Sequence, residues 1–129
     1  MTKKKIEIGA FLPSAGEFPR KYGVNNMAIR LEELGFSSLW VSDHILMPEI
    51  IKADYPFAKD KKATWDTNIA WYDSLILLSM AAAVTKNIKL GTAVLVLPLR
   101  HPIIFAKQAA TIDELSKGRL VLGIGAGWL

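Results

Sequence analysis

The chain has 129 residues, with 16 lysines and arginines against 12 aspartates and glutamates, and 51% of its residues are hydrophobic. This composition fits one globular domain and excludes an intrinsically disordered chain, which buries too little apolar surface to fold. Because the chain has no cysteine and only two histidines, disulfide scaffolds, thiolate zinc sites and iron-sulfur clusters are excluded, and we expect no metal site.

The net charge of +4 does not by itself indicate a nucleic-acid partner. The basic residues are scattered except in segments 3–5 and 59–62, which favours a solvated basic surface. The longest apolar stretch, 75–84, is shorter than the roughly 20 residues that span a bilayer. The basic start is followed by a segment interrupted by Glu7 and Gly9 and stopped by Pro13, unlike a secretory signal. We therefore expect a cytoplasmic protein with no membrane or nucleic-acid partner.

The first third of the chain predicts a strand, a helix and a second strand. Residues 6–12 alternate partly between apolar and polar positions, which is typical of a strand. Residues 24–34 carry apolar side chains at helical spacing, with Gly35 placed to end the helix. The short apolar run 36–42 predicts a second strand that ends in Asp43 and His44.

Residues 45–72 contain prolines, aromatic residues and a charge run without sustained periodicity, as expected of a lid-like insertion. Asp73 is a predicted N-cap for a helix through Thr85 that is apolar nearly all round, so we expect it to pack on two sides. The run 88–97 predicts a strand covered on both faces. Pro102 begins the next predicted helix, and a fourth strand, 119–124, follows.

Strands that alternate with helices predict a parallel α/β sheet, here with four strands, three helices and a long loop after the second strand. The chain ends two residues beyond a glycine-rich strand end. Four parallel strands alone leave unpaired edges and a bare face. We therefore expect this chain to be part of a larger fold or to associate with a second copy.

Ligands of parallel α/β folds bind at the carboxyl ends of the strands. There, His44 beside Asp43 is either a proton donor or ring-carbonyl partner, or a structural hydrogen-bonding residue. The glycines that follow the fourth strand allow either close approach of a flat or phosphorylated ligand or a tight turn. Arg100 lies before a helix N-terminus and either attracts an anion or is a solvent-exposed connection. Aromatic residues of the loop either line an apolar substrate pocket or form the loop's own small core: Tyr55, Phe57, Trp65, Trp71 and Tyr72.

Four blocks carry a family resemblance: ELGFSSLWVSDH at 33–44, LGTAVLVLPLRHP at 90–102, AKQAATID at 106–113 and GRLVLGIGAGW at 118–128. In this order they resemble the bacterial luciferase-like monooxygenase family, and within it the branch of oxidoreductases that use the deazaflavin coenzyme F420. The resemblance implies a TIM (β/α)8 barrel, of which residues 1–129 are the N-terminal half and 45–72 the insertion. It also implies a flavin- or deazaflavin-dependent oxidoreductase or monooxygenase acting on a small organic substrate, with FMN as the alternative cofactor.

The resemblance also assigns residues to roles. Asp43 and His44 would lie beside the cofactor ring, with His44 as the catalytic residue near its polar edge. Ala93 and Val94 correspond to a bulge behind the ring that is often built around a non-prolyl cis peptide bond, and we expect a cis bond or a bulge there. Ala126 and Gly127 correspond to contacts of the fourth strand with the cofactor: in all, Asp43, His44, Ala93, Val94, Ala126 and Gly127.

Some sugar-phosphate dehydrogenases of the family carry a catalytic glutamate where this chain has Trp128, which leaves that chemistry without its acid. The alternative functions are a non-catalytic flavin-binding or oligomer-forming relative and, less favoured, a basic nucleic-acid binder. We expect the chain either to form a homo-oligomer or to be completed by the C-terminal half of the barrel.

Overall fold

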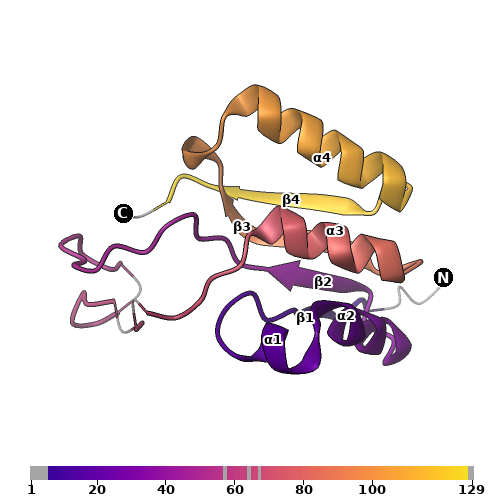
Figure 1. Ribbon diagram of the computed structural model, residues 1–129, viewed down its shortest axis with the longest axis horizontal. Helices are drawn as coiled ribbons and strands as arrows, with labels where there is room; N and C mark the ends of the chain where they lie inside the picture. The colour runs from indigo at the N-terminus through magenta and orange to yellow at the C-terminus, as the bar shows by residue number, and fades with distance from the viewer. Residues whose placement is uncertain (1–5, 57, 64, 67, 128–129) are drawn as a thin grey trace.

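The computed structural model describes residues 6–56, 58–63, 65–66 and 68–127. Four parallel strands form one sheet in the order β1-β2-β3-β4, so neighbours in the sequence are neighbours in the sheet (Figure 1). This confirms the predicted parallel α/β architecture. The first strand is shorter than predicted. The strands are β1 (Gly9–Phe11), β2 (Ser38–Val41), β3 (Lys89–Val96) and β4 (Leu120–Gly125).

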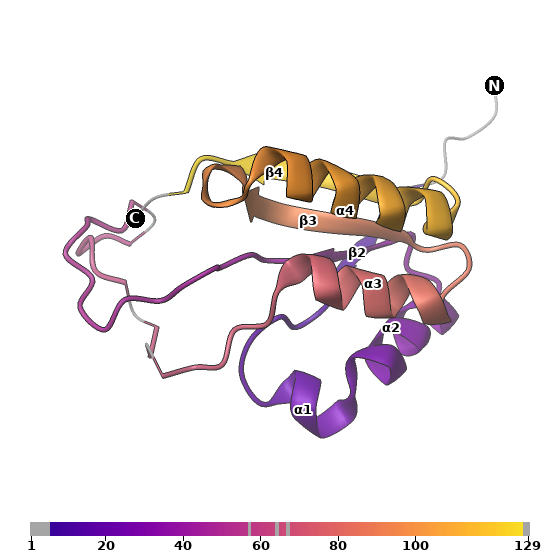
Figure 2. The same cartoon turned by 45° about the horizontal axis from the view of Figure 1, so that its top comes forward.

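Each connection between strands contains a helix. Figure 2 shows α2, α3 and α4 side by side along the sheet. Three helices were the expectation from apolar periodicity, whereas the described chain has four and a single 3-10 turn. The additional helix, α1, has five residues and begins beside Pro19, and a segment of that length is too short to show a 3.6-residue period. The elements are α1 (Phe18–Tyr22), α2 (Val24–Glu33), α3 (Ser74–Val84), η1 (Leu97–Leu99) and α4 (Pro102–Ser116).

The core lies between the helices and one face of the sheet. One cluster joins α2 and α3 to the first three strands through residues such as Ala28, Leu39 and Leu78, each with no exposed surface. A second cluster joins α4 to β3 and β4 around Leu95 and Phe105. Each of these helices therefore covers the sheet with buried apolar side chains, as the apolar spacing predicts.

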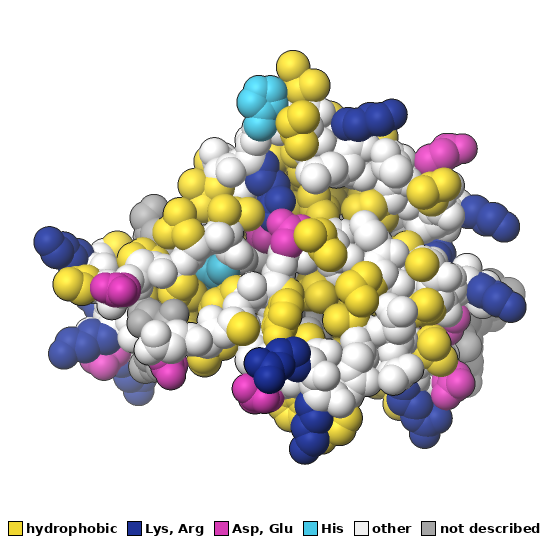
Figure 3. All heavy atoms as spheres, viewed as in Figure 1, with side chains coloured by type: hydrophobic (Ala, Val, Ile, Leu, Met, Phe, Trp, Pro, Cys, Tyr) yellow, Lys and Arg dark blue, Asp and Glu magenta, His cyan; other side chains and the backbone are white. Residues whose placement is uncertain are grey.

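Helix α3 packs on more than one side, as its apolar pattern predicts, but part of its surface is exposed. It packs on the sheet between α2 and α4, but Ile76 is 63% exposed and Met80 is 40% exposed. Figure 3 shows hydrophobic side chains gathered over the middle of this face, with charged side chains towards its outline. An uninterrupted apolar helix therefore has one exposed apolar stripe.

The amino ends of the strands are held by a charged clamp. Arg119 donates hydrogen bonds to the carbonyls of Ala82, Thr85 and Ile88 and to the Thr85 hydroxyl, at 2.8–3.1 Å. The Glu32 carboxylate accepts from the backbone N–H groups of the same turn, residues 86–88. Partial burial alone would raise the pKa of Glu32, but these N–H donors and the charge of Arg119 outweigh it and lower that pKa.

Candidate functional site

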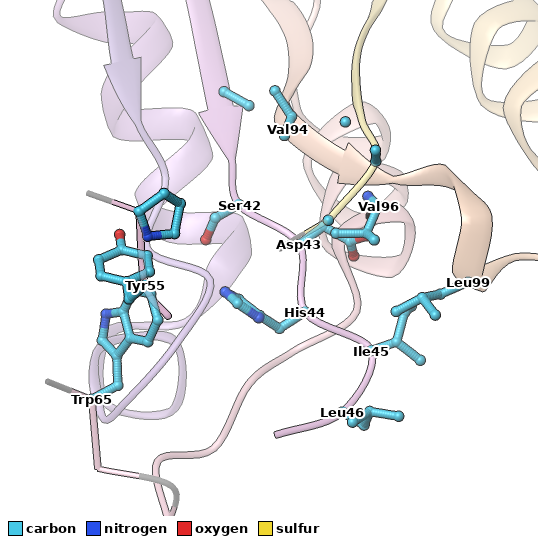
Figure 4. A pocket seen from close by; sticks show the side chains of 15 residues that line it. Ser42, Asp43, His44, Ile45, Leu46, Tyr55, Trp65, Val94, Val96 and Leu99 are labelled. Atoms are coloured by element: carbon cyan, nitrogen blue, oxygen red, sulfur yellow. Dashed lines mark hydrogen bonds between the residues drawn. The ribbon is translucent and has the colours of Figure 1, made fainter. Parts of the chain in front are cut away.

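A cavity of about 530 Å³ lies at the carboxyl ends of β2, β3 and β4. Figure 4 shows the side chains that surround it. Its size falls in the range of about 300–1,000 Å³ that small-molecule sites occupy. All six residues that the sequence singles out for binding lie on its wall: Asp43, His44, Ala93, Val94, Ala126 and Gly127.

The strand side of the cavity is interrupted in β3. The register of β3 against β4 shifts between Thr92 and Leu95, so that β3 has one residue more than β4 over this stretch. The peptide bond between Ala93 and Val94 is cis. The prediction of a cis bond or bulge at this position is confirmed.

Glycines of β4 allow the bulge to lie close to its neighbour. The Thr92 hydroxyl bonds both the carbonyl oxygen and the N–H of Gly123, at 2.9 and 3.1 Å. A Cβ on Gly125 would lie 2.6 Å from Cγ2 of Val94, and Gly127 has φ of +85°. Gly125 therefore allows close packing against Val94, and Gly127 makes a turn with positive φ. The sequence left open whether these glycines serve close approach or a tight turn, and both occur here. Only small or aliphatic side chains cover this wall.

Asp43 faces away from the cavity. Its side chain has no exposed surface, so the 3% of the residue that is exposed belongs to its backbone. The carboxylate accepts hydrogen bonds from the Ser74 hydroxyl at 2.9 Å, the N–H of Val96 at 3.0 Å and Nη2 of Arg100 at 2.6 Å. The backbone of Asp43 therefore lines the cavity, whereas its carboxylate makes hydrogen bonds and an ion pair inside the protein.

Arg100 departs from both sequence-based expectations, since it is neither an exposed anion ligand nor a solvated connection. Its side chain is 10% exposed and pairs with Asp43 and, at 3.2 Å, with Asp73. Asp73 also accepts from the N–H groups of Leu75 and Ile76, which confirms the predicted N-cap of α3. One buried ion-pair network thus joins the ends of β2 and β3 to the start of α3.

His44 is held by aromatic rings. Its ring centroid lies 4.2 Å from that of Trp71 and 5.7 Å from that of Trp65. Burial lowers the pKa of His44, and the negative charge of Asp43 opposes this only in part, so the imidazole is neutral at neutral pH. No hydrogen bond joins its ring nitrogens to another described residue. The neutral ring is therefore a hydrogen-bonding group on the cavity wall.

The long loop supplies the side of the cavity opposite the bulge. Tyr55 and Trp65 line it, with ring centroids 4.7 Å apart, whereas Tyr72 packs on the main core. The aromatic residues thus divide between pocket and packing, and Phe57 lies outside the described residues. Gly125, one of the glycines considered for close approach of a ligand, also lines the cavity. Several further lining residues were not among the predicted binding residues, although they lie at strand ends or in the loop: Ser42, Ile45, Leu46, Pro56, Val96 and Leu99.

The fold and this cavity match one family of proteins. The family model described as luciferase-like monooxygenase matches residues 7–129, and the chain belongs to that family. An uncharacterized protein of Mycobacterium tuberculosis is 41% identical over 103 residues, 78% of this chain and 36% of that protein. An F420-dependent glucose-6-phosphate dehydrogenase of Amycolatopsis mediterranei is 36% identical over 101 residues, 78% of this chain and 26% of that enzyme.

Two solved structures share the fold of this chain. The coenzyme F420-dependent tetrahydromethanopterin reductase of Methanopyrus kandleri matches with a TM-score of 0.65 and 27% identity over 96% of this chain and 28% of that one. A type II Baeyer-Villiger monooxygenase of Pseudomonas putida in complex with FMN matches with a TM-score of 0.65 and 24% identity, over 95% of this chain and 30% of that one, and shows the fold alone.

The chain spans about a third of the length of these relatives. Its fold is accordingly that of a partial TIM barrel, which confirms the expected architecture. Trp128, for which the resemblance implied a departure from the family pattern, lies outside the described residues. In the described part of the chain, no helix combines the length and apolar character needed to cross a bilayer, and no group of three or more metal-ligating side chains is found among the described residues.

Proposed function

We propose that this chain forms the cofactor side of a cytoplasmic oxidoreductase that holds coenzyme F420, or alternatively FMN, at the carboxyl ends of β2, β3 and β4. The observation that carries the proposal is the cavity backed by the bulge at Ala93 and Val94 and by the glycines of β4. Relatives in the family include an enzyme named for its use of F420 and a structure in complex with FMN.

The residues of the cavity fit a planar ring. Because Gly125 and Gly127 have no Cβ, the side chains of Val94 and Val96 lie close against the backbone of β4 and of the turn after it. The wall they form is apolar and carries only small or aliphatic side chains, so a flat ring can pack against it. When bound, such a ring supplies hydride transfer or, for reduced FMN, oxygen activation. The protein's part is to orient the ring and to keep water away from it.

His44 is the residue that we propose to act at the ring. Its neutral imidazole can donate one hydrogen bond to a carbonyl at the ring's polar edge. The rings of Trp65 and Trp71 fix its direction. Asp43 contributes backbone contacts, while Ala93, Val94, Ala126 and Gly127 contact the ring.

The test compares the two cofactors directly. Both F420 and FMN fluoresce, so their binding to the purified chain is measured by fluorescence anisotropy. We expect F420 to bind more tightly, and Gly125→Leu, whose Cβ would collide with Val94 in the wall of the cavity, to abolish binding. Tighter binding of FMN would assign the chain to the alternative cofactor, and no binding of either would reject the proposal.

Turnover separates an enzyme from a non-catalytic flavin-binding relative. We expect His44→Ala to lower turnover with little change in melting temperature, because substitutions at a site usually alter stability by about 0.5 kcal/mol. His101→Ala is the matched control, because His101 is exposed and outside the cavity. Bound cofactor without turnover would favour the non-catalytic alternative.

We also propose that this chain is not a monomer in solution. β1 and β4 are edge strands, and α4 exposes Ile103 and Leu115 by 73% and 77%. Unpaired strand edges and exposed apolar side chains favour association with a second copy or with the rest of a barrel. Size-exclusion chromatography with light scattering tests this, and a monodisperse species of 14.3 kDa with a cooperative melt would contradict it.

A further inference from the structure

We infer that the substrate of this site is an uncharged molecule with a planar apolar part, which lies against a wall formed by Tyr55 and Trp65. The inference rests on the proposed function, because it assigns the strand side of the cavity to the cofactor ring and the loop side to the substrate. It names a substrate class and two specificity-determining residues.

The cavity has two different walls. The strand wall is small and consists of the bulge in β3 and the glycine-rich end of β4. The loop wall is large and apolar. In Figure 4 the rings of Tyr55 and Trp65 lie together on one side, Val96 and Leu99 lie on the other, and His44 lies between them. A molecule that enters beside the strand wall therefore meets aromatic rings on its other side.

The aromatic rings are placed for packing against another flat group. Tyr55 and Trp65 meet edge to face, with centroids 4.7 Å apart and planes at 70°. Trp65 and His44 meet at 5.7 Å and 64°. Aromatic groups prefer such edge-to-face and offset contacts, which add to the apolar area that they bury. The group formed by Tyr55, Trp65 and His44 can extend this packing to a planar ligand.

The charges of the wall exclude an anion. None of the described residues that line it is lysine or arginine. The carboxylate of Asp43 is buried against Arg100, and His44 is neutral at neutral pH because burial lowers its pKa. A substrate whose phosphate or carboxylate lay against the loop wall would meet no cation among the described lining residues, which is unfavourable in an apolar environment.

The cations of the loop lie elsewhere. Lys52, Lys61 and Lys62 line a separate hollow together with three acidic residues. Lys61 pairs with Asp54 at 3.0 Å. This hollow shares Trp65 with the cavity, but none of the three lysines is among the described residues that line the cavity, and Lys61 is compensated by Asp54.

The polar groups that do line the cavity suit a neutral oxygen. Ser42 shares a hydrogen bond of 2.7 Å with Ser14, and its hydroxyl can take part in one more. The imidazole of His44 has both a donor and an acceptor nitrogen when neutral. A hydroxyl or carbonyl on an otherwise apolar substrate can therefore be satisfied here, whereas a sugar phosphate cannot be at these residues.

The experiment compares 2-naphthol with 2-naphthoate, which share one ring system and differ in charge, and adds glucose 6-phosphate as a sugar phosphate. Calorimetric titration measures 2-naphthol, 2-naphthoate and glucose 6-phosphate against the purified chain, without cofactor and with saturating F420. We expect 2-naphthol to bind at least about tenfold more tightly than 2-naphthoate, and glucose 6-phosphate not to bind. We also expect Tyr55→Leu to weaken 2-naphthol by about tenfold, near the upper range for one aromatic pair.

The control is Tyr22→Leu, which removes a half-exposed tyrosine of α1 that lies outside the cavity, and it should leave the affinity unchanged. Four results would each overturn the inference. The unsubstituted chain could bind 2-naphthoate as tightly as 2-naphthol, could bind glucose 6-phosphate, or could fail to bind 2-naphthol both without cofactor and with F420. The fourth result is an unchanged affinity of Tyr55→Leu for 2-naphthol. Failure of F420 and FMN to bind while the naphthol preference persists would instead reject the proposed function and leave the preference of the loop wall standing.

Discussion

Replacing Arg100 with methionine tests whether the buried ion-pair network holds the site together. Methionine keeps much of the apolar stem and removes the guanidinium. The carboxylate of Asp43 then keeps its hydrogen bonds from Ser74 and Val96 but loses its only salt-bridge partner among the described residues. Asp73 loses its pairing as well.

The burial of this pair gives the magnitude. The Asp43 side chain is fully buried and that of Arg100 is 10% exposed, so solvent does not replace the lost partner. Removing one member of a buried ion pair costs about 3–5 kcal/mol, because it leaves a charge without compensation. With a urea m value of about 2 kcal/mol/M, this corresponds to a fall of about 2 M in the unfolding midpoint.

The assay is equilibrium urea unfolding followed by circular dichroism and tryptophan fluorescence. Arg30→Met is the matched control: Arg30 and Glu33 pair at 3.1 Å, but their side chains are 67% and 57% exposed. Such a surface pair contributes at most about 0.5 kcal/mol. A loss below about 1 kcal/mol in Arg100→Met would refute the reasoning.

A second substitution keeps the test decisive if Arg100→Met unfolds without denaturant. Adding Asp43→Asn removes the unpaired charge, so the double variant should be more stable than Arg100→Met alone. Coupling of about 0.5–3 kcal/mol is typical of residues in direct contact. Simple additivity of the two losses would show that the pair is not the source of the stability.

Local signals in the sequence predicted much of the fold. The N-cap at Asp73 and the helix start at Pro102 depend on residues within one turn, and both lie where they were expected. The alternation of strands and helices fixed a parallel sheet, whose strand ends must share one edge. That geometry placed Asp43 and His44 at the same edge as the ends of the third and fourth strands, whereas the bulge at Ala93 and Val94 was predicted from the family resemblance.

The direction of individual side chains could not be predicted in the same way. Arg100 contacts a residue 57 positions away in the sequence, and no local pattern records such a contact. The family resemblance implied that Asp43 lies beside a cofactor ring, but only the packing of α3 and the end of β3 shows that its carboxylate points into the protein. The loop's aromatic residues could not be divided between pocket and core, because that division depends on how an irregular segment folds back on the sheet.

Three further predictions concern the rest of the chain. Glu32→Gln should lower the free energy of unfolding by about 1 kcal/mol at pH 7, with Glu33→Gln as the exposed control. Because the folded pKa of Glu32 is lowered, this stabilisation exists above its ordinary value of 4.5 and should vanish as the pH falls through the folded value. In an NMR titration His44, assigned by comparison with His101→Gln, should protonate below the ordinary histidine value of 6.5. Gly123→Ala should cost about 1–3 kcal/mol in thermal unfolding, because the added Cβ meets a backbone carbonyl of β3, which cannot rotate away as a side chain can. Unchanged stability would show that the bulge yields to the methyl group.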